Sequence, residues 1–427
     1  MIINIIIDPD DNYSARELDS TIDLNNQNEF SYTFWAIKDR FPAWYNTKAL
    51  DLMYISMAVF AADRKVLRLD ANDGWSRDFT LHIPVMNNEL FCENNELICS
   101  MPNYLTGDNW HFIWRPRELN GQELRHRDRR HRKDKPEKRY NKVCMFSGGM
   151  DSFIGAIDLL ETGGDDILFV SHYGGGKGVK EYQDRLISLF TNKYSLEARD
   201  FIQFHAKAIN GVEDTTRSRS FMFFSHAVVF ASAMQEPIDI IIPENGLISL
   251  NIPLTFSRIG SSSTRTTHPY YIKMLQQLLD NLGLEIRFLN PYQFKTKGEM
   301  LLECKNQTFM KTNIINTMSC SHPDVGRNRG EKVTMHCGYC LPCVIRQAAM
   351  KRAGLIDNTS YYDSKFQIVK EAKKIHNSYK LGLHQFDPHY SFMSIQQNGR
   401  IDQNDTEYAE LYVRGMNELK NYLDGIK

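Results

Sequence analysis

A short glycine-containing segment, Ser147-Gly148-Gly149-Met150-Asp151-Ser152, follows an apolar run at residues 143–146 and precedes a stretch with helical spacing. Glycine lets the backbone approach a phosphate group closely, and the free N–H groups at the start of a helix attract an anion. The hydroxyls of Ser147 and Ser152 add hydrogen-bond donors. Because the Asp151 carboxylate would repel a bare phosphate, a bridging Mg2+ is expected. The segment therefore predicts a nucleotide-binding loop, although its spacing is not that of a Walker A loop.

Four cysteines in the last third of the chain have the spacing of metal ligands. Cys337, Cys340 and Cys343 follow one another at two-residue gaps, and Cys320 lies 17 positions before Cys337. Four thiolates suit tetrahedral Zn2+, which makes a structural zinc site the favoured interpretation. An iron–sulfur cluster is a less favoured alternative, because cysteine ligation alone does not select the metal. A redox Cys-x-x-Cys pair would leave two thiols unexplained. His336 is an outside candidate for a ligand.

These residues need elements that bring them together. Short apolar runs predict strands at residues 143–146, 167–173, 201–206, 238–243 and 285–290, and helical spacing separates them, as at residues 221–234 and 270–282. This alternation predicts an α/β fold with a Rossmann-like parallel sheet and right-handed crossovers. Ligands are then expected at the carboxyl ends of the strands.

Shifts in composition divide the chain into five segments. All five tryptophans lie before residue 115, which sets apart an N-terminal accessory domain (1–124), expected to be mixed and β-rich. Ten of the eighteen residues from 125 to 142 are Lys or Arg, typical of a basic linker. The nucleotide-binding domain (143–300), a zinc-binding subdomain (301–356) and a C-terminal helical region (357–427) follow. Asn404 and Glu407 predict a capping box at the start of the last helix.

The overall composition narrows the class of protein without naming a function. The 427 residues carry 51 Lys+Arg and 52 Asp+Glu, and 42% are hydrophobic. This excludes disorder throughout and argues against a general polyanion binder. No apolar run approaches the ~18 residues that a membrane helix needs, and the first residues do not have the features of a signal peptide. We therefore expect a cytoplasmic protein with reduced thiols and no membrane association.

Together, the loop and the cysteines resemble the PP-loop ATP pyrophosphatases, and within them the QueC family of 7-cyano-7-deazaguanine synthases. The resemblance covers about residues 142–355 and includes the ending Thr317-Met318-Ser319-Cys320 with Cys337, Cys340 and Cys343. It implies a HUP-type PP-loop sheet with a four-cysteine zinc subdomain. The sequence also departs from the family. Its Gly-Arg-Asn appears as Ser218-Arg219-Ser220, and its Pro-Asp-Cys-Arg substrate motif is absent.

The resemblance implies ATP, Mg2+ and Zn2+ as cofactors and a 7-deazaguanine-type carboxylic acid as substrate, adenylated and then converted to an amide or nitrile. It assigns ATP binding to the loop Ser147–Ser152, Tyr173 and Asn245. Neutralising the charge that develops needs cations, for which we expect Lys177, Arg219 and Lys297 beside Asp151 as catalytic residues. The expected substrate-binding residues are Glu244, Arg265 and His268.

The added N-terminal unit and helical tail resemble the QatC family, the QueC-like component of the Qat anti-phage defence systems. That similarity implies a QatB-like protein partner, held through the N-terminal domain. The acceptor amine could belong to this partner or be ammonia. Two alternatives stay open. One is a PP-loop tRNA-modifying enzyme, with the basic linker on nucleic acid, which is not favoured; it needs a reactive cysteine near the loop, where Cys144 is nearest but is expected to pack. The other is a catalytically inactive nucleotide-binding module.

Overall fold

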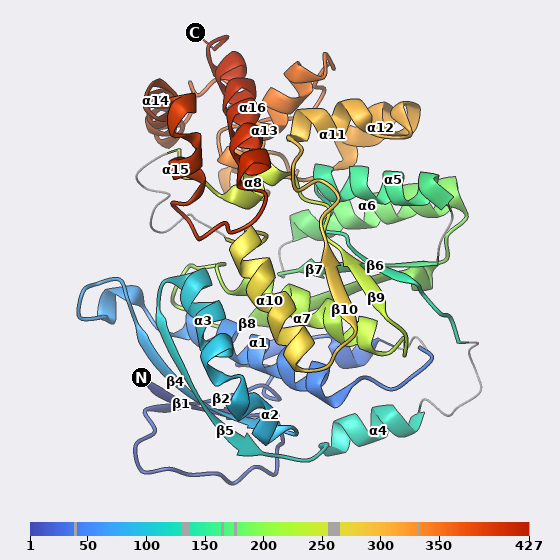
Figure 1. Ribbon diagram of the computed structural model, residues 1–427, viewed down its shortest axis with the longest axis vertical. Coiled ribbons are helices and arrows are strands. Elements are labelled where there is room, and N and C mark those ends of the chain that lie inside the picture. The colour runs from blue at the N-terminus through green and yellow to red at the C-terminus, as the bar shows by residue number, and fades with distance from the viewer. Residues whose placement is uncertain are drawn as a thin grey trace.

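In the computed structural model, two sheets share one apolar core and form the lower and middle parts of the molecule as drawn in Figure 1. The structure describes residues 1–37, 41–129, 137–163, 166–174, 177–254, 265–331 and 333–426. Residues 130–136 of the expected basic linker, and Gly164 at the expected end of the loop helix, lie outside these ranges. Residues 121–129, which include the start of that linker, form helix α4 (Gly121–Arg129).

The N-terminal unit is a small parallel sheet covered by helices. Its strands lie in the order β2 (Ser20–Asp23), β1 (Ile2–Ile6), β4 (Asp78–Val85) and β5 (Asn109–Pro116), each parallel to its neighbour. Parallel strands need crossover connections, which here contain α1 (Thr47–Lys65), α2 (Asn88–Glu93) and α3 (Asn95–Thr106). The unit is therefore mixed α/β, and the expectation of a β-rich domain is corrected: α1 alone is 19 residues long.

The second sheet has the order β10, β9, β6, β7, β8, β3 among the described residues. Its parallel strands are β6 (Lys142–Met145), β7 (Ile167–Tyr173), β8 (Phe201–Ala208), β9 (Ile238–Ile241) and β10 (Ile286–Leu289). All five lie on the expected runs. Numbered from β6, the order reads 3-2-1-4-5, so the chain reverses direction across the sheet between β6 and β9. Strand β3 (Phe30–Tyr32), from the N-terminal segment, adds an antiparallel edge beside β8.

Alternation along the strands sends side chains to two different cores. Val143 and Met145 face the core that contains α1, α7 (Arg219–Ser232) and α10 (Pro269–Asn281). Cys144 and Phe146 face the other core, which contains α5 (Met150–Gly163) and part of α6 (Lys177–Tyr194). Helices thus cover both faces of a largely parallel sheet, as buried strand runs require.

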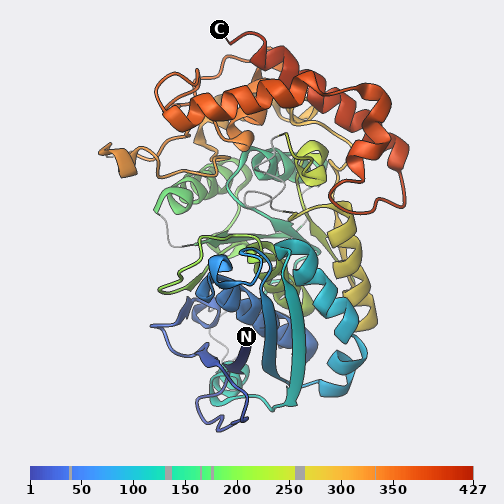
Figure 2. The same cartoon turned by 90° about the vertical axis from the view of Figure 1, so that its left-hand side faces the viewer.

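The C-terminal third lies above the carboxyl ends of the second sheet, at the opposite end of the molecule from the N-terminal unit (Figures 1 and 2). It contains α11 (Lys297–Glu303), α12 (Gln307–Asn313), α13 (Leu341–Arg352), α14 (Lys370–His384), α15 (Ser391–Ile395) and α16 (Asp405–Leu423). A separate apolar core joins α13 to α16 with the short helix α8 (Gly246–Leu250). In the described part of the chain, no helix is both long and apolar enough to cross a bilayer.

The last helix begins where expected but without the expected cap. Asn404 precedes α16, yet its φ of +55° lies in the left-handed region and its side chain makes no capping hydrogen bond. A capping side chain usually belongs to a residue in an extended conformation, so the predicted capping box with Glu407 does not form. The helix packs through one apolar face, on which Tyr408, Leu411 and Met416 are buried.

Candidate nucleotide and metal sites

The segment 147–152 lies at the carboxyl end of β6 and turns directly into α5. Gly148 has φ +87°, a conformation that favours glycine, and a Cβ there would lie 3.0 Å from Gln183 Cγ. Within the loop, the Ser147 and Ser152 hydroxyls are 3.2 Å apart, and Ser147 Oγ accepts from the Gly149 N–H at 3.3 Å. The loop therefore presents two hydroxyls and a helix N-terminus at the point where the sheet order reverses.

Three residues outside the motif hold this loop in place. Gln183, on α6, donates its amide to the Ser147 carbonyl and to the His172 carbonyl, each at 3.1 Å. Ser319 accepts a hydrogen bond from the Met150 N–H at 3.1 Å, and the Met318 N–H donates to the Gly148 carbonyl at 2.8 Å. These contacts span more than 30 and more than 160 positions in the sequence, so spacing alone could not reveal them.

Asp151 is the centre of a buried polar cluster. Lys297 Nζ lies 3.0 Å from Asp151 Oδ1, and both side chains are at most 7% exposed. Asn245 donates its side-chain amide to Asp151 Oδ2 at 2.7 Å and accepts from the Ile248 N–H, so it joins Asp151 to the first turn of α8. Three predicted site residues from β6–α5, β9–α8 and α11 are thereby brought together.

The position of Lys297 is fixed by a capping box. Thr296 Oγ1 accepts from the Glu299 N–H at 3.1 Å, and the Glu299 carboxylate accepts from the Thr296 N–H at 2.9 Å. This makes Lys297 the first residue of α11. A cation is unfavourable at a helix N-terminus, and the ion pair with Asp151 offsets that cost.

Glu244 completes the cluster with a second carboxyl group. Burial, and then the neighbouring Asp151 carboxylate, raise the pKa of Glu244 well above its usual range. Burial opposes ionisation of Asp151 as well, but Lys297, Glu244 and Asn245 together lower the pKa of Asp151 below its ordinary value. Of the two carboxyl groups, Asp151 is therefore the one that ionises more readily. Two adjacent carboxyl groups are a donor set that suits Mg2+ when both are deprotonated.

The four cysteines converge as predicted. All four sulfurs lie within 4.8 Å of one another, and the Cys320–Cys340 and Cys337–Cys343 Sγ distances are both 3.9 Å. A tetrahedral zinc with Zn–S bonds of about 2.3 Å places its sulfurs about 3.8 Å apart, so the group fits the ion. Backbone N–H groups of Cys337 and Cys340 donate to the sulfurs of Cys320 and Cys337, at 3.2 and 3.3 Å.

Two buried side chains, those of His336 and Arg346, hold the segment that carries Cys320 through contacts with Thr317. His336, the outside ligand candidate, is buried and hydrogen-bonds through Nε2 to the Thr317 carbonyl at 3.1 Å, with Nδ1 3.7 Å from Cys343 Sγ. Arg346 is fully buried and donates to Thr317 Oγ1 at 2.6 Å. The strand-like segment 317–320 is thus held on one side by the cysteine subdomain and on the other by the phosphate loop.

Three further residues predicted for the site, Tyr173, Arg219 and Lys177, lie on β7, α7 and α6. Tyr173 ends β7, half-buried, with its carbonyl 3.0 Å from His205 Nδ1. Arg219 is the exposed first residue of α7 and acts electrostatically on His172, at the end of β7. Lys177 begins α6, but its side chain is outside the described parts of the structure.

Arg265 and His268, predicted to bind substrate, contact the N-terminal unit instead of the Asp151 cluster. Arg265 donates to the Tyr104 carbonyl at 2.7 Å and its guanidinium stacks over the Tyr104 ring. His268 is fully buried at the N-cap of α10, where its Nδ1 accepts from the Tyr270 N–H at 3.2 Å, and burial lowers its pKa to about 3. Its observed contacts are those of a helix cap.

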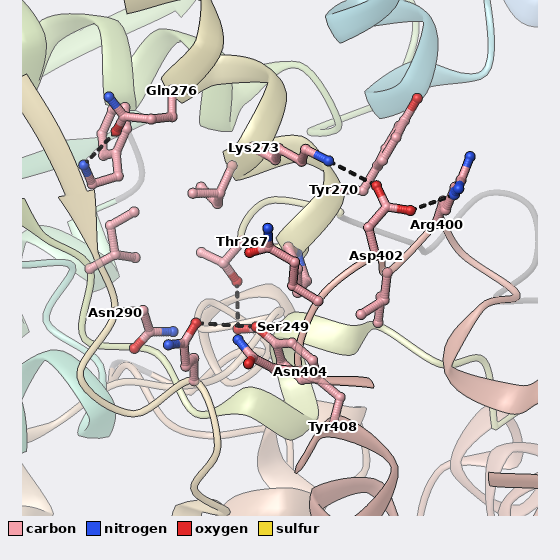
Figure 3. A pocket seen from close by; sticks show the side chains of 17 residues that line it. Ser249, Thr267, Tyr270, Lys273, Gln276, Asn290, Arg400, Asp402, Asn404 and Tyr408 are labelled. Carbon is pink, nitrogen blue, oxygen red and sulfur yellow. Dashed lines mark hydrogen bonds and ion pairs between the residues drawn. The ribbon is translucent and has the colours of Figure 1, made fainter. Parts of the chain in front are cut away.

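A cavity of about 380 Å³ opens between α10, the end of β10 and residues 400–408 (Figure 3). Its charged side chains pair with one another: Lys273 donates to Asp402 at 2.8 Å, and Arg400 contacts the same carboxylate. On its inner wall, Ser249 and Thr267 share a hydrogen bond of 3.0 Å. Ser249 is on α8, the helix that Asn245 begins, so this cavity is linked structurally to the Asp151 cluster.

Comparison with protein-family models, with curated proteins and with solved structures finds no match for this chain. The features that can do chemistry are therefore those that its own side chains display. They are a phosphate-type loop with a buried carboxylate–lysine pair and, connected to it, a group of four cysteines that could hold zinc.

Proposed function

We propose that this protein is a QueC-like, ATP-dependent ligase that adenylates a 7-carboxy-7-deazaguanine-type acid and transfers the activated acyl group to an amine. The observation that carries the proposal is the buried Asp151–Lys297 pair, which is held directly behind a glycine-containing loop at the carboxyl end of β6. The PP-loop fold is part of the proposal. Its support is the 3-2-1-4-5 strand order, with the loop at the strand next to the reversal point.

The proposed chemistry has two balanced steps. An oxygen of the acid attacks the α-phosphorus of ATP, the bond from that phosphorus to the bridging oxygen breaks, and pyrophosphate leaves. The amine nitrogen then attacks the acyl carbon and gives up a proton, and AMP leaves with the electron pair of the broken C–O bond. The product is an amide. Where the amine is ammonia, the oxygen of the primary amide can attack a second ATP and release pyrophosphate; AMP then leaves with that oxygen, the nitrogen loses its two protons, and a nitrile remains.

The first step brings a carboxylate against a triphosphate, so negative charge must be neutralised. The N–H groups at the start of α5 and the hydroxyls of Ser147 and Ser152 would bind phosphate oxygens. Asp151 and Glu244 are the residues that would hold Mg2+, which when bound neutralises phosphate charge. Lys297 keeps Asp151 ionised and so keeps this donor set ready.

The cysteine group has a structural role in the proposal. The segment that supplies Cys320 also supplies Met318 and Ser319, which contact the loop. A zinc ion bound by Cys320, Cys337, Cys340 and Cys343 would therefore fix the conformation of the phosphate loop.

The tRNA-thiolation alternative finds less support. It requires an accessible, reactive thiol beside the loop, but Cys144 is fully buried on β6 and burial raises the pKa of its thiol. The proposed setting in anti-phage defence, with a QatB-like protein as amine donor, follows from the sequence resemblance.

Pyrophosphate release is the test of the proposed reaction. The purified chain with ATP, Mg2+ and 7-carboxy-7-deazaguanine should release pyrophosphate in amounts that depend on the acid, and Asp151→Ala should not. The mass of a co-expressed partner then tests the acceptor. A partner mass that is the same with wild-type and Asp151→Ala enzyme excludes ligation to that protein, while acid-dependent pyrophosphate release would still support small-molecule synthesis.

A further inference from the structure

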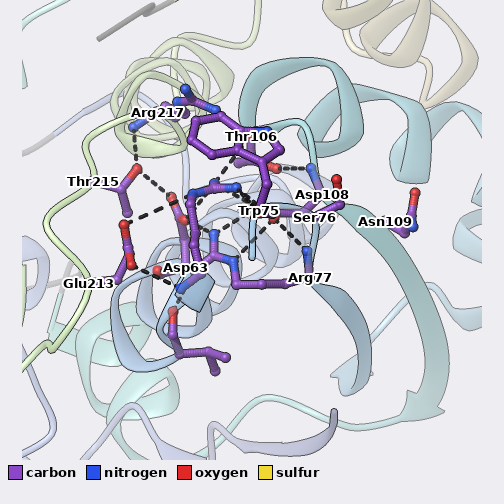
Figure 4. Close-up of polar contacts among 12 residues, drawn as sticks. Asp63, Trp75, Ser76, Arg77, Thr106, Asp108, Asn109, Glu213, Thr215 and Arg217 are labelled. Atoms are coloured by element: carbon purple, nitrogen blue, oxygen red, sulfur yellow. Dashed lines mark hydrogen bonds and ion pairs between the residues drawn. The ribbon is translucent and has the colours of Figure 1, made fainter. Parts of the chain in front are cut away.

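A buried charge cluster lies between the N-terminal unit and the segment that leads into α7 (Figure 4). Arg77 contacts Asp63 at 2.5 Å and Asp108 at 2.7 Å, and Arg68 contacts Asp108 through both of its terminal nitrogens, at 2.8 and 2.9 Å. The second oxygen of Asp63 accepts from Ser218 Oγ at 2.6 Å. The two aspartates are thus fully engaged by two arginines and a serine.

A third arginine of this cluster, Arg217, has no such partner. It is 7% exposed, and in the described part of the chain no carboxylate lies within 4 Å of its guanidinium. Nη1 donates to the Thr106 carbonyl at 2.6 Å, and the guanidinium stacks on the Trp75 ring at 4.9 Å, as Figure 4 shows. Nη2 is buried and has no hydrogen-bond partner among the residues that the structure describes. A buried charged donor without an acceptor is costly, which indicates that a ligand supplies one.

Arg217 stays cationic at neutral pH in spite of its burial. Desolvation, and then the neighbouring Arg68, lower its pKa to about 10, with a further contribution from Arg265. The positive charge is therefore present and only partly compensated where Nη2 lies. An oxyanion would satisfy both the charge and the free donor.

The same arginine lines a cavity of about 630 Å³. Most of the surrounding side chains are apolar and come from α8, α13 and α14, including Leu247, Ile248, Leu341, Ile345 and Tyr379. The acidic residues in its lining, Asp214 and Glu371, are exposed, and Glu371 lies 3.9 Å from Lys374. The lining also contains the polar side chains of Asn251, Ser321 and Ser378. The cavity therefore suits a ring that packs against apolar side chains, has polar groups at its edge and bears one anionic group.

Two walls of this cavity are formed by segments that are continuous with residues contacting the loop at 147–152. One wall is α8, which starts after Asn245, the residue bound to Asp151. Another includes Ser321 and His322, which follow the loop-contacting Ser319. A ligand in the cavity thus lies against two of the segments that contact the loop.

We infer that this cavity binds an organic carboxylate that carries a ring, and that Arg217 is the residue that selects the carboxylate. The inference rests on the proposed function in one respect: it identifies this ligand as the acid to be activated. The competing interpretation is that Arg217 only caps the carboxyl end of α3, as Arg265 does through the Tyr104 carbonyl.

Isothermal titration of the full chain separates these interpretations. The probes are 7-carboxy-7-deazaguanine, its neutral nitrile analogue, and indole-3-carboxylate as an acid without the purine-like ring. The wild-type chain should bind the carboxylic acid at least tenfold more tightly than the nitrile. Arg217→Gln should lose that difference and keep its affinity for ATP; Arg217→Lys, which preserves the charge, should lose only part of it.

Arg64→Gln is the matched control. Arg64 holds the segment before α7, to which Arg217 belongs, through Asp214 and the Thr215 carbonyl, both at 3.2 Å. It does not line the cavity. It should preserve the tenfold preference. The inference is overturned if folded Arg217→Gln retains the preference, or if the wild type binds neither acid. Arg217-dependent binding of indole-3-carboxylate alone supports the inference, while the absence of acid-dependent pyrophosphate release counts against the proposed function only.

Discussion

The backbone N–H of Met150 donates a hydrogen bond to Ser319 Oγ at 3.1 Å, and Ser319 immediately precedes Cys320 of the cysteine group. The first turn of the loop helix and the metal-type site therefore share one short segment. Met318 adds a backbone hydrogen bond of 2.8 Å to Gly148. A cysteine group held in one conformation should therefore also restrict the conformations of the loop at 147–152, because residues 318–320 connect the two.

Loss of zinc from the cysteine group should make the loop formed by residues 147–152 less ordered. We expect one zinc per wild-type chain, and Cys340→Ser should lose it because a tetrahedral site with one ligand removed binds more weakly. Hydrogen exchange at residues 147–152 should then become faster. The exposed Cys92 offers the control Cys92→Ser, which should change neither zinc content nor exchange. Loss of zinc without faster exchange in the loop would contradict the coupling.

Lys297→Met should be strongly destabilising as well as inactive. It leaves the buried Asp151 carboxylate without its cation, and breaking a buried ion pair costs about 3–5 kcal/mol. The matched control is Lys295→Met, two residues away, whose pair with Glu303 is partly exposed and contributes about 0–1 kcal/mol. Urea unfolding monitored by circular dichroism measures both. Similar unfolding midpoints for the two variants would show that the Lys297 pair is not stabilising.

A methyl group at Gly246 should displace the start of α8. A Cβ there would lie 2.0 Å from the Gln293 carbonyl oxygen and 2.4 Å from Leu411 Cδ2, so the backbone must move. Gly246→Ala should lower the unfolding free energy by about 2 kcal/mol and weaken ATP binding, because Asn245 moves with the helix. Gly174→Ala, where no described atom lies within 4 Å of the added carbon, should be near neutral. Equal effects at both positions would contradict this account.

The stability of the chain should fall as pH decreases below about 6.5, in part because of His226. This side chain is fully buried, stacks on Phe204 at 4.1 Å and hydrogen-bonds to the Met222 carbonyl at 2.8 Å. Burial lowers its pKa from 6.5 to about 4. Its stabilising effect is therefore complete above pH 6.5 and is lost as pH falls towards 4, because the unfolded chain binds a proton that the native state excludes.

The size of this effect follows from the difference in pKa. At pH 5, the contribution of His226 is smaller than at pH 8 by about 2 kcal/mol. Urea titrations at both pH values should show a weaker pH dependence in His226→Leu than in the wild type. If the two chains lose stability in parallel between pH 8 and pH 5, His226 is not the group responsible.

Local patterns accounted for much of the second sheet. The runs at residues 167–173 and 238–243 are buried on both faces, and such strands read as continuous apolar stretches. The cysteine spacing likewise predicted a convergence that the structure confirms. In both cases the signal lies within a few neighbouring residues.

Long-range contacts account for what the sequence could not reveal. Gln183 and Ser319 hold the phosphate loop from distant segments, and Arg217 acquires its environment only where Trp75 and Thr106 of the N-terminal unit meet it. Arg217 stands two positions before Arg219, the residue expected from the motif. A clue was present in the run of charged and polar residues before α7, but burial, which singles out Arg217, is a tertiary property.

The most direct test of the central claim is the exchange of labelled pyrophosphate into ATP, which requires reversible adenylation of an acid. With 7-carboxy-7-deazaguanine and Mg2+, the wild-type chain should catalyse exchange, and Asp151→Asn, which removes the buried negative charge but keeps the side-chain shape, should lower the rate at least a hundredfold. Exchange that does not depend on the acid, or that persists at the wild-type rate in Asp151→Asn, would contradict the account.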